Sequence, residues 1–377
     1  MTKEKPIFVT KPSLPPLEDL QAKLGTIWSS GILTNGGPLH EELEAELCKY
    51  LGVEHISLFA NGTLALLIAL KSARLTGEII TSPFSFVATS QAISWNNLTP
   101  IFADINPDTY TLDPDSIVKC ISSRTTAILP VHCYGIPCEV DTINQIAEDY
   151  NLKVIYDAAH AFGVSCHCGS ILNHGDLSIL SFHATKVFNT FEGGAIISPD
   201  AKTKSKIDRL KNFGFIDQEN VASNGINAKM SELNAAVGLC QLKYIDSAIE
   251  NRKTISEIYD KHLTTHPLIK RPTLNDIQKY NYSYYPIRLV SDDSSANLRD
   301  YIFDQLKADN IFCRKYFYPL ISEFQLYKND ANKTPYAITV ANQVLCLPIY
   351  PELSKSNATR IATHVLKAIE TYIKEKI

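Results

Sequence analysis

Short apolar runs alternate with segments of helical period through the first half of the chain. The runs cover residues 56–59, 79–80, 100–103, 127–131, 153–156, 177–182 and 195–198. Between two of them, Val140, Ile143, Ala147 and Tyr150 recur three or four positions apart. Strands that are apolar on both faces and alternate with helices are typical of a mostly parallel sheet between two layers of helices. We therefore predict an α/β fold with its active site at the strand ends.

The first forty residues are expected to form an arm rich in turns, because residues 12, 15 and 16 are proline and residues 36–38 read Gly-Gly-Pro. A helix follows, in which leucine recurs every four positions from Leu39 to Leu51 and Gly52 stands at the C-terminal cap. After about Met230 the alternation stops. Residues 231–263 predict one long helix or two in succession, with Leu233, Val237 and Ile255 on the buried face.

Strands near residues 284–290, 311–316 and 344–348, together with two more helices, predict a smaller α+β unit beyond residue 263. We place a large domain with its N-terminal arm at residues 1–240 and a small C-terminal domain at residues 241–377. A chain of 377 residues with 45% hydrophobic residues is long enough to bury both cores.

The net charge limits which partners we expect for the protein, and the cysteine content indicates its cellular compartment. The net charge of −4 gives no general attraction to nucleic acid or to an anionic membrane, and no apolar run is long enough to span a bilayer, so we expect neither partner. Nine cysteines at irregular spacings, with no secretory leader ahead of them, predict reduced thiols in the cytoplasm.

Three polar features stand where a cofactor could bind. Lys186 comes just after the apolar run 177–182, and Asp157 directly follows the run 153–156. Residues 60–63, Ala-Asn-Gly-Thr, join a strand to an apolar helix over residues 64–75, and the unpaired N–H groups at a helix start suit an anion. Each feature also has a plain structural interpretation: a solvated loop lysine, a turn or cap aspartate, and a helix capped by Thr63.

Taken together, the three features match the requirements of pyridoxal phosphate. This cofactor needs an amine for its Schiff base, a carboxylate for its pyridine nitrogen and donors for its phosphate. The chain has neither G-x-G-x-x-G after a strand nor a P-loop motif, which argues against a dinucleotide or an ATP site of those kinds.

Five motifs between residues 36 and 232 carry a resemblance to a known family. They are N-G-T at 61–63, S-P-F-S-F-V-A-T at 82–89, V-H-C-Y-G-I-P at 131–137, Y-D-A-A-H-A-F-G at 156–163 and S-F-H-A-T-K at 181–186. In these motifs the chain resembles the DegT/DnrJ/EryC1/StrS sugar aminotransferases. The resemblance implies a pyridoxal-phosphate enzyme of the aspartate aminotransferase fold, fold type I, that aminates nucleotide-linked keto sugars.

The resemblance also implies roles for single residues. Lys186 is the Schiff-base lysine and proton carrier, Asp157 the partner of the pyridine nitrogen, and His160 a neighbour of the phenolic oxygen. Phe86 is the ring stacked on the cofactor, although a plain core phenylalanine is the alternative. The implied phosphate ligands are Gly62, Thr63, Ser181 and, from a neighbouring subunit, Asn227. A homodimer with shared active sites follows from the last of these.

Three further residues bear on the substrates. His183, three positions before Lys186, matches enzymes of the family that aminate position 4 of the sugar, where those that aminate position 3 commonly have tyrosine; packing beside the cofactor is the alternative. Lys229 replaces an arginine that many members use to grip a carboxylate, which leaves the binding of the amino donor open. Tyr316, in R-K-Y-F-Y-P-L, matches a loop that faces the nucleotide sugar, or packs locally.

The resemblance thus implies transfer of an amino group from L-glutamate to a nucleotide-linked 4-keto-6-deoxy sugar for a surface polysaccharide such as O-antigen. It favours dTDP-4-keto-6-deoxyglucose as acceptor and the glucose over the galactose epimer of the 4-amino product. The alternatives are that galactose epimer, 3-amination, a sugar dehydratase of the same fold and a non-enzymatic sensor. Lys186 argues against the dehydratase, in which histidine replaces it, and the absence of a basic patch argues against a DNA-binding regulator.

The cluster Cys166, His167, Cys168 and His174 suggests a zinc site. Neighbouring residues of an extended strand face opposite sides, however, and the second C-x-x-C pair of a structural zinc site is missing. We therefore expect no metal.

Overall fold

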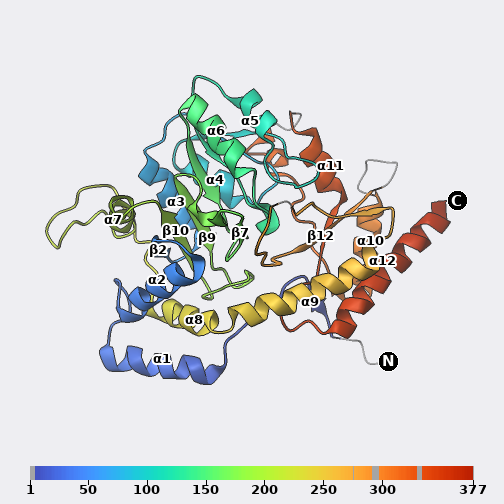
Figure 1. Cartoon of the computed structure of the whole chain (residues 1–377), viewed down its shortest axis with the longest axis horizontal. Coiled ribbons are helices and arrows are strands. Elements are labelled where there is room, and N and C mark those ends of the chain that lie inside the picture. The colour runs from blue at the N-terminus through green and yellow to red at the C-terminus, as the bar shows by residue number, and fades with distance from the viewer. Residues whose placement is uncertain (1–4, 275, 291–296, 329–332, 377) are drawn as a thin grey trace.

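The computed structural model describes residues 5–274, 276–290, 297–328 and 333–376. Its centre is a seven-stranded sheet of order β2-β10-β9-β6-β5-β3-β4 (Figure 1). The strands from β4 to β9 in this order are parallel, and β10 runs antiparallel to both of its neighbours. The predicted fold class is confirmed. The strands are β2 (His55–Phe59), β3 (Glu78–Thr81), β4 (Thr99–Phe102), β5 (Thr125–Leu129), β6 (Lys153–Asp157), β9 (Leu177–Ser181) and β10 (Gly194–Ser198).

Helices cover both faces of this sheet, because alternate residues of each strand are apolar on opposite sides. Ile179 and Ile196 face one core, whereas Leu180 and Ile197 face the other. Among the described residues, no helix has the length and apolar composition needed to cross a bilayer. The first face carries α3 (Gly62–Ala73), α4 (Ala88–Trp95) and α7 (Ala201–Leu210); the second carries α2 (Pro38–Leu51), α5 (Pro114–Cys120) and α6 (Val140–Tyr150).

Helix α2 forms as its leucine pattern predicts. Pro38 occupies the first turn, where a missing N–H costs no hydrogen bond. Leu43 and Leu47 are fully buried, and each such side chain contributes about 1.5–3 kcal/mol. Gly52 ends the helix at φ 64°, a left-handed conformation that favours glycine.

The N-terminal arm differs from the prediction, because it contains a helix, α1 (Leu17–Ser30). Leu20, Leu24 and Ile27 lie three or four positions apart and pack into the core next to α8. The prediction of an arm rich in turns therefore omitted this helix. Proline at 15 and 16 does not break this helix, since both residues precede its first turn.

Residues 231–263 form two helices, α8 (Glu232–Leu242) and α9 (Ile245–Leu263), one of the two predicted forms. Val237 and Ile255 are buried as expected. The prediction is wrong for Leu233, which is 43% exposed, because neighbours cover this face of α8 only from Val237 onward.

A second, antiparallel sheet lies in the C-terminal part of the chain. It consists of β11 (Ile269–Lys270), β12 (Tyr285–Leu289) and β14 (Val344–Leu347), and it shares a separate core with α9, α10 (Asn297–Ala308) and α12 (Lys355–Lys376). α11 (Pro335–Gln343) also belongs to this part, and β1 (Ile7–Phe8) from the N-terminal arm pairs with β13 (Ile311–Phe312). The smaller α+β unit is thus present, while the division after residue 240 stays a prediction.

The segment between β6 and β9 contains a tight hairpin of β7 (Ser165–Cys166) and β8 (Gly169–Ser170). The chain turns within the run from Cys166 to Cys168, so the premise of an extended strand there is wrong. Short 3₁₀ turns in the described residues include η1 (Cys133–Gly135), η2 (Ile171–Asn173) and η3 (Ile321–Glu323).

Candidate active site

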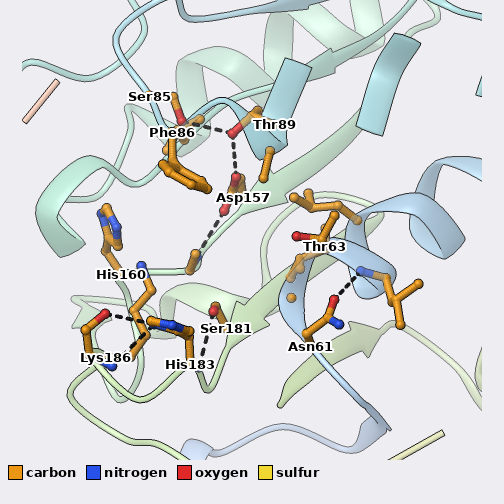
Figure 2. A pocket seen from close by; sticks show the side chains of 18 of the residues that line it. Asn61, Thr63, Ser85, Phe86, Thr89, Asp157, His160, Ser181, His183 and Lys186 are labelled. Carbon is orange, nitrogen blue, oxygen red and sulfur yellow. Dashed lines mark hydrogen bonds between the residues drawn. The ribbon is translucent and has the colours of Figure 1, made fainter. Parts of the chain in front are cut away.

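A cavity of about 580 Å³ opens at the carboxyl ends of β6 and β9 and at the start of α3 (Figure 2). Its position agrees with the predicted one. The structure brings together nine of the residues singled out from the sequence, which come from separate loops. They are Gly62, Thr63, Phe86, Asp157, His160, Ser181, His183, Lys186 and Tyr316.

Asp157 is the last residue of β6 and is almost fully buried at the cavity floor. Its Oδ2 accepts a hydrogen bond of 2.8 Å from the Thr89 hydroxyl, and its Oδ1 accepts one of 3.1 Å from the N–H of Ala159. Burial raises the pKa of this carboxyl, although both hydrogen bonds and the charge of Lys186 oppose the change. A buried carboxylate held in this way suits a cationic ring nitrogen.

Lys186 lies in the loop between β9 and β10, where its N–H donates to the carbonyl oxygen of His183 over 2.9 Å. Part of its surface stays accessible through the cavity. Burial lowers the pKa of its amine to about 8, against the opposing charge of Asp157. A larger share of the amine is therefore neutral and nucleophilic near neutral pH than in an ordinary lysine.

The turn before α3 forms a cradle for an anion, here called the 61–63 cradle. The side chain of Asn61 caps the helix by accepting from the N–H of Leu64 over 2.9 Å, so the alternative of a Thr63 cap is wrong. The N–H groups of Gly62 and Thr63 remain at the cavity wall. The cradle fits a phosphate group by its donors.

Glycine is required where the cradle meets the strand ends. A Cβ on Gly62 would lie 2.9 Å from the Cβ of Ser181, and a Cβ on Gly194 would lie 2.7 Å from the backbone of Asn61. Only glycine allows this close approach, which places the Ser181 hydroxyl beside the cradle.

Two rings line the cavity above the floor. His160 Nδ1 accepts from the N–H of Tyr134 over 3.1 Å, and burial lowers the pKa of this histidine well below its usual value. His160 is therefore neutral, with its proton on Nε2. Phe86 is 57% exposed, so the alternative of a plain core phenylalanine is wrong.

His183 and Tyr316 lie on the cavity wall as well. His183 Nδ1 lies 2.9 Å from the Thr185 hydroxyl, and its Nε2 lies 3.7 Å from the Glu192 carboxylate. The ring of Tyr316 packs edge-on against Tyr284 at 5.6 Å between centroids. Both residues keep polar atoms close to the space where a substrate must sit.

Asn227 and Lys229 do not line this cavity. Asn227 is exposed, and the Lys229 amine donates to the Asn212 side chain over 2.7 Å. Sequence reasoning also missed several residues of the site. Thr89 belongs to a quoted motif and Glu192 follows Lys186 in the same loop, so both were detectable, whereas Tyr284 reaches the cavity only through the folding of a distant segment.

An α/β fold that gathers a lysine, a carboxylate and an anion cradle at its strand ends is that of the pyridoxal-phosphate aminotransferases of fold type I. The sequence model of the DegT/DnrJ/EryC1/StrS aminotransferase family matches residues 17–366. The chain belongs to this family, and it is therefore a sugar aminotransferase that depends on pyridoxal phosphate.

Individual relatives give the same result. The chain is 50% identical, over 96% of its length and 99% of the relative's, to a dTDP-4-amino-4,6-dideoxy-D-glucose transaminase from Escherichia coli. The structure of DesI in the presence of its TDP-sugar product is similar with a TM-score of 0.92 and 33% identity, covering 99% of this chain and 96% of DesI. NtdA from Bacillus subtilis with bound cofactor PMP has a TM-score of 0.86 and 28% identity, over 94% and 82% of the two chains.

Proposed function

We propose that the chain transfers the amino group of L-glutamate to dTDP-4-keto-6-deoxy-D-glucose and yields dTDP-4-amino-4,6-dideoxy-D-glucose. The observation that carries the proposal is the cavity that joins Lys186, Asp157 and the 61–63 cradle, in a chain 50% identical to the Escherichia coli transaminase named for this product. Such a product suits the synthesis of O-antigen or another surface polysaccharide. The nine cysteines at irregular spacings support a cytoplasmic location.

The residues on the cavity floor fit pyridoxal phosphate by their chemistry. When bound, this cofactor draws electrons from the carbon that exchanges protons during transamination. In the proposal Asp157 keeps the pyridine nitrogen protonated, because a buried carboxylate favours a cation beside it. Lys186 holds the cofactor through its amine and, once that amine is free, carries a proton to and from the reacting carbon.

Other residues orient the cofactor. Phe86, exposed at the cavity wall, would hold the flat cofactor ring by apolar contact and keep water away from the amine. His160 donates its Nε2–H to the phenolic oxygen, since its Nδ1 is occupied by Tyr134. The phosphate is held by Gly62, Thr63 and Ser181.

A homodimer completes the site in this proposal. Asn227 reaches the phosphate bound by the other subunit, and Lys229 of the same segment meets the donor carboxylate there. The exposure of Asn227 outside its own cavity supports this assignment. A lysine offers one point charge where an arginine offers two parallel donors, so donor binding here is less directional than with arginine.

The acceptor is positioned by the cavity wall. We assign His183 to the region around the reacting carbonyl, because it lies in the same loop as Lys186 and its ring faces the cavity. Its contacts then favour amination at position 4. Tyr316, which also lines the cavity and packs against Tyr284, is assigned to the nucleotide sugar.

One experiment tests the reaction and its alternatives together. The enzyme is incubated with dTDP-4-keto-6-deoxyglucose and L-glutamate, and the product is examined by proton NMR. An equatorial amino group at position 4 is expected. An amino group at position 3 contradicts the regiochemistry, and an axial one at position 4, the galactose epimer, contradicts only the stereochemistry. No turnover of this substrate contradicts the proposed acceptor.

A further inference from the structure

The hairpin of β7 and β8 gathers sulfur and nitrogen ligands away from the active-site cavity. The ligand atoms of Cys166, His167 and Cys168 all lie within 4.8 Å of one another. His174, which follows the turn η2, returns to the same place: its Nε2 lies 3.5 Å from the Cys166 sulfur and 3.2 Å from the Cys168 sulfur. None of these four residues lines the active-site cavity.

One of the two imidazoles belongs to the hairpin, and the other comes from the segment after η2. His167 Nδ1 lies 2.6 Å from the carboxylate of Asp276, so its ring is oriented and its Nε2 stays available. A carboxylate bound to the far nitrogen of a histidine is the usual support of a metal-ligating imidazole. The proposed transfer of an amino group assigns no role to Asp276.

We propose that this cluster binds one Zn²⁺ through Cys166, Cys168, His174 and His167. Two thiolates and two imidazoles form a ligand set that zinc favours over magnesium or calcium. Both thiols lose their protons to solvent when the ion binds. The site is structural, because all four positions around the ion are filled by protein.

One distance already fits a tetrahedral site, whereas the distance between the two sulfurs does not. With zinc–sulfur bonds of about 2.3 Å and zinc–nitrogen bonds of about 2.0 Å, ligand atoms lie roughly 3.5–3.8 Å apart. The contact between Cys166 and His174 matches this spacing at 3.5 Å. The two sulfurs are closer, at 2.6 Å, so one must move outward by roughly 1 Å. Cys168 is exposed and has the room to do so.

Through the contact between His167 and Asp276, the hairpin is connected to a segment that supports the active site. Ser165 pairs with the segment that follows Asp276, donating its N–H to Lys279 over 3.0 Å. Two residues after Lys279, the side chain of Asn281 donates a hydrogen bond of 2.8 Å to the carbonyl oxygen of the active-site residue His160. Zinc at the hairpin therefore stabilises this support without entering the reaction.

The test uses the full-length holoenzyme, purified with a reducing agent, freed of metal by a chelator and titrated with Co²⁺ and then Zn²⁺. We expect one Co²⁺ per chain, with the visible bands of a tetrahedral thiolate site that zinc then removes. Cys168→Ser is expected to lose stoichiometric binding. Asp276→Asn, which retains all four ligands, is expected to bind about ten- to a hundredfold more weakly.

Cys48→Ser is the matched control, since Cys48 is partly exposed, lies outside the cluster and donates its thiol hydrogen to the carbonyl oxygen of Glu54, at 3.6 Å. It is expected to bind like the parent protein. The proposal is overturned if the reduced parent binds no zinc in a one-to-one ratio, or if Cys168→Ser binds as tightly as the parent. An intact mass lower by two hydrogen atoms after purification under reducing conditions also overturns it, because the pair is then a disulfide.

Discussion

The cavity floor and the segment around Asn227 differ in how they contribute to the proposed active site: the floor is complete within one chain, whereas Asn227 requires a second chain. On the floor, Asp157 is buried, bonded by Thr89 and Ala159, and close to Lys186 in the same chain. Asn227 is exposed and lies outside the cavity. The difference teaches that burial and hydrogen bonding prepare the floor before any partner arrives, whereas Asn227 acquires a role only if a second chain presents a cavity to it.

Replacement of Lys186 tests the floor with the largest expected effect. Lys186→Ala removes the only group assigned to hold the cofactor covalently, so turnover is expected to vanish while the fold persists. The measurements are product formation with glutamate and thermal unfolding. A variant that keeps a tenth of the parent's rate contradicts the assignment of this lysine.

Asp157→Asn changes the floor by one charge. The amide no longer stabilises a protonated pyridine nitrogen, and activity is expected to fall on the order of a thousandfold while cofactor still binds. Cofactor content and kcat are measured on the same preparation. Near-normal turnover with full cofactor content assigns Asp157 a purely structural role.

Mixing two inactive variants tests whether Asn227 acts on the cavity of the partner subunit. Lys186→Ala and Asn227→Ala are each expected to be severely impaired, but a hybrid dimer holds one site with both residues intact. After subunit exchange, activity is expected to return to about a quarter of the parent value for random pairing. If exchange is verified and activity does not recover, Asn227 does not act across an interface.

Replacing Thr89 tests the hydrogen bond that this residue donates to Asp157, and a smaller loss of activity is expected. Thr89→Val removes the 2.8 Å hydrogen bond to Asp157 at nearly constant volume, and kcat is expected to fall about tenfold. Thr89→Ser keeps the hydroxyl and serves as the control. Equal losses in both variants would indicate that packing, rather than the hydrogen bond, matters at this position.

The lowered pKa of Lys186 predicts the smallest effect, on the rate at which cofactor-free protein attaches pyridoxal phosphate. Only the neutral amine reacts, so with a pKa of about 8 the rate rises with pH through this value and levels off above it. Between pH 7.5 and 8.5 the neutral fraction increases about threefold. A rate that keeps rising tenfold per pH unit up to pH 10 indicates an ordinary lysine pKa.

Most of the central sheet was predictable from the sequence, because its strands are short apolar runs and each is separated from the next by helical periodicity or glycine. The C-terminal ends of β6 and β9 directly located Asp157 and Lys186. Helix α1 was not predicted because prolines at 12, 15 and 16 favour turns, although all three precede its first turn.

Other features were not predictable because they depend on the folded chain. Asn61 and Thr63 are both good capping residues, and only the backbone geometry selects Asn61. The exposure of Leu233 depends on where its neighbours end. The turn at Cys166 converts alternating residues into a cluster that an extended strand would separate.

The most direct test of the account is to locate the covalent bond to the cofactor. The holoenzyme is reduced with borohydride, digested, and its peptides are analysed by mass spectrometry. The account predicts that the yellow colour bleaches and that the reduced cofactor is attached to the peptide containing Lys186. Attachment to another lysine such as Lys229, or to none, would contradict it.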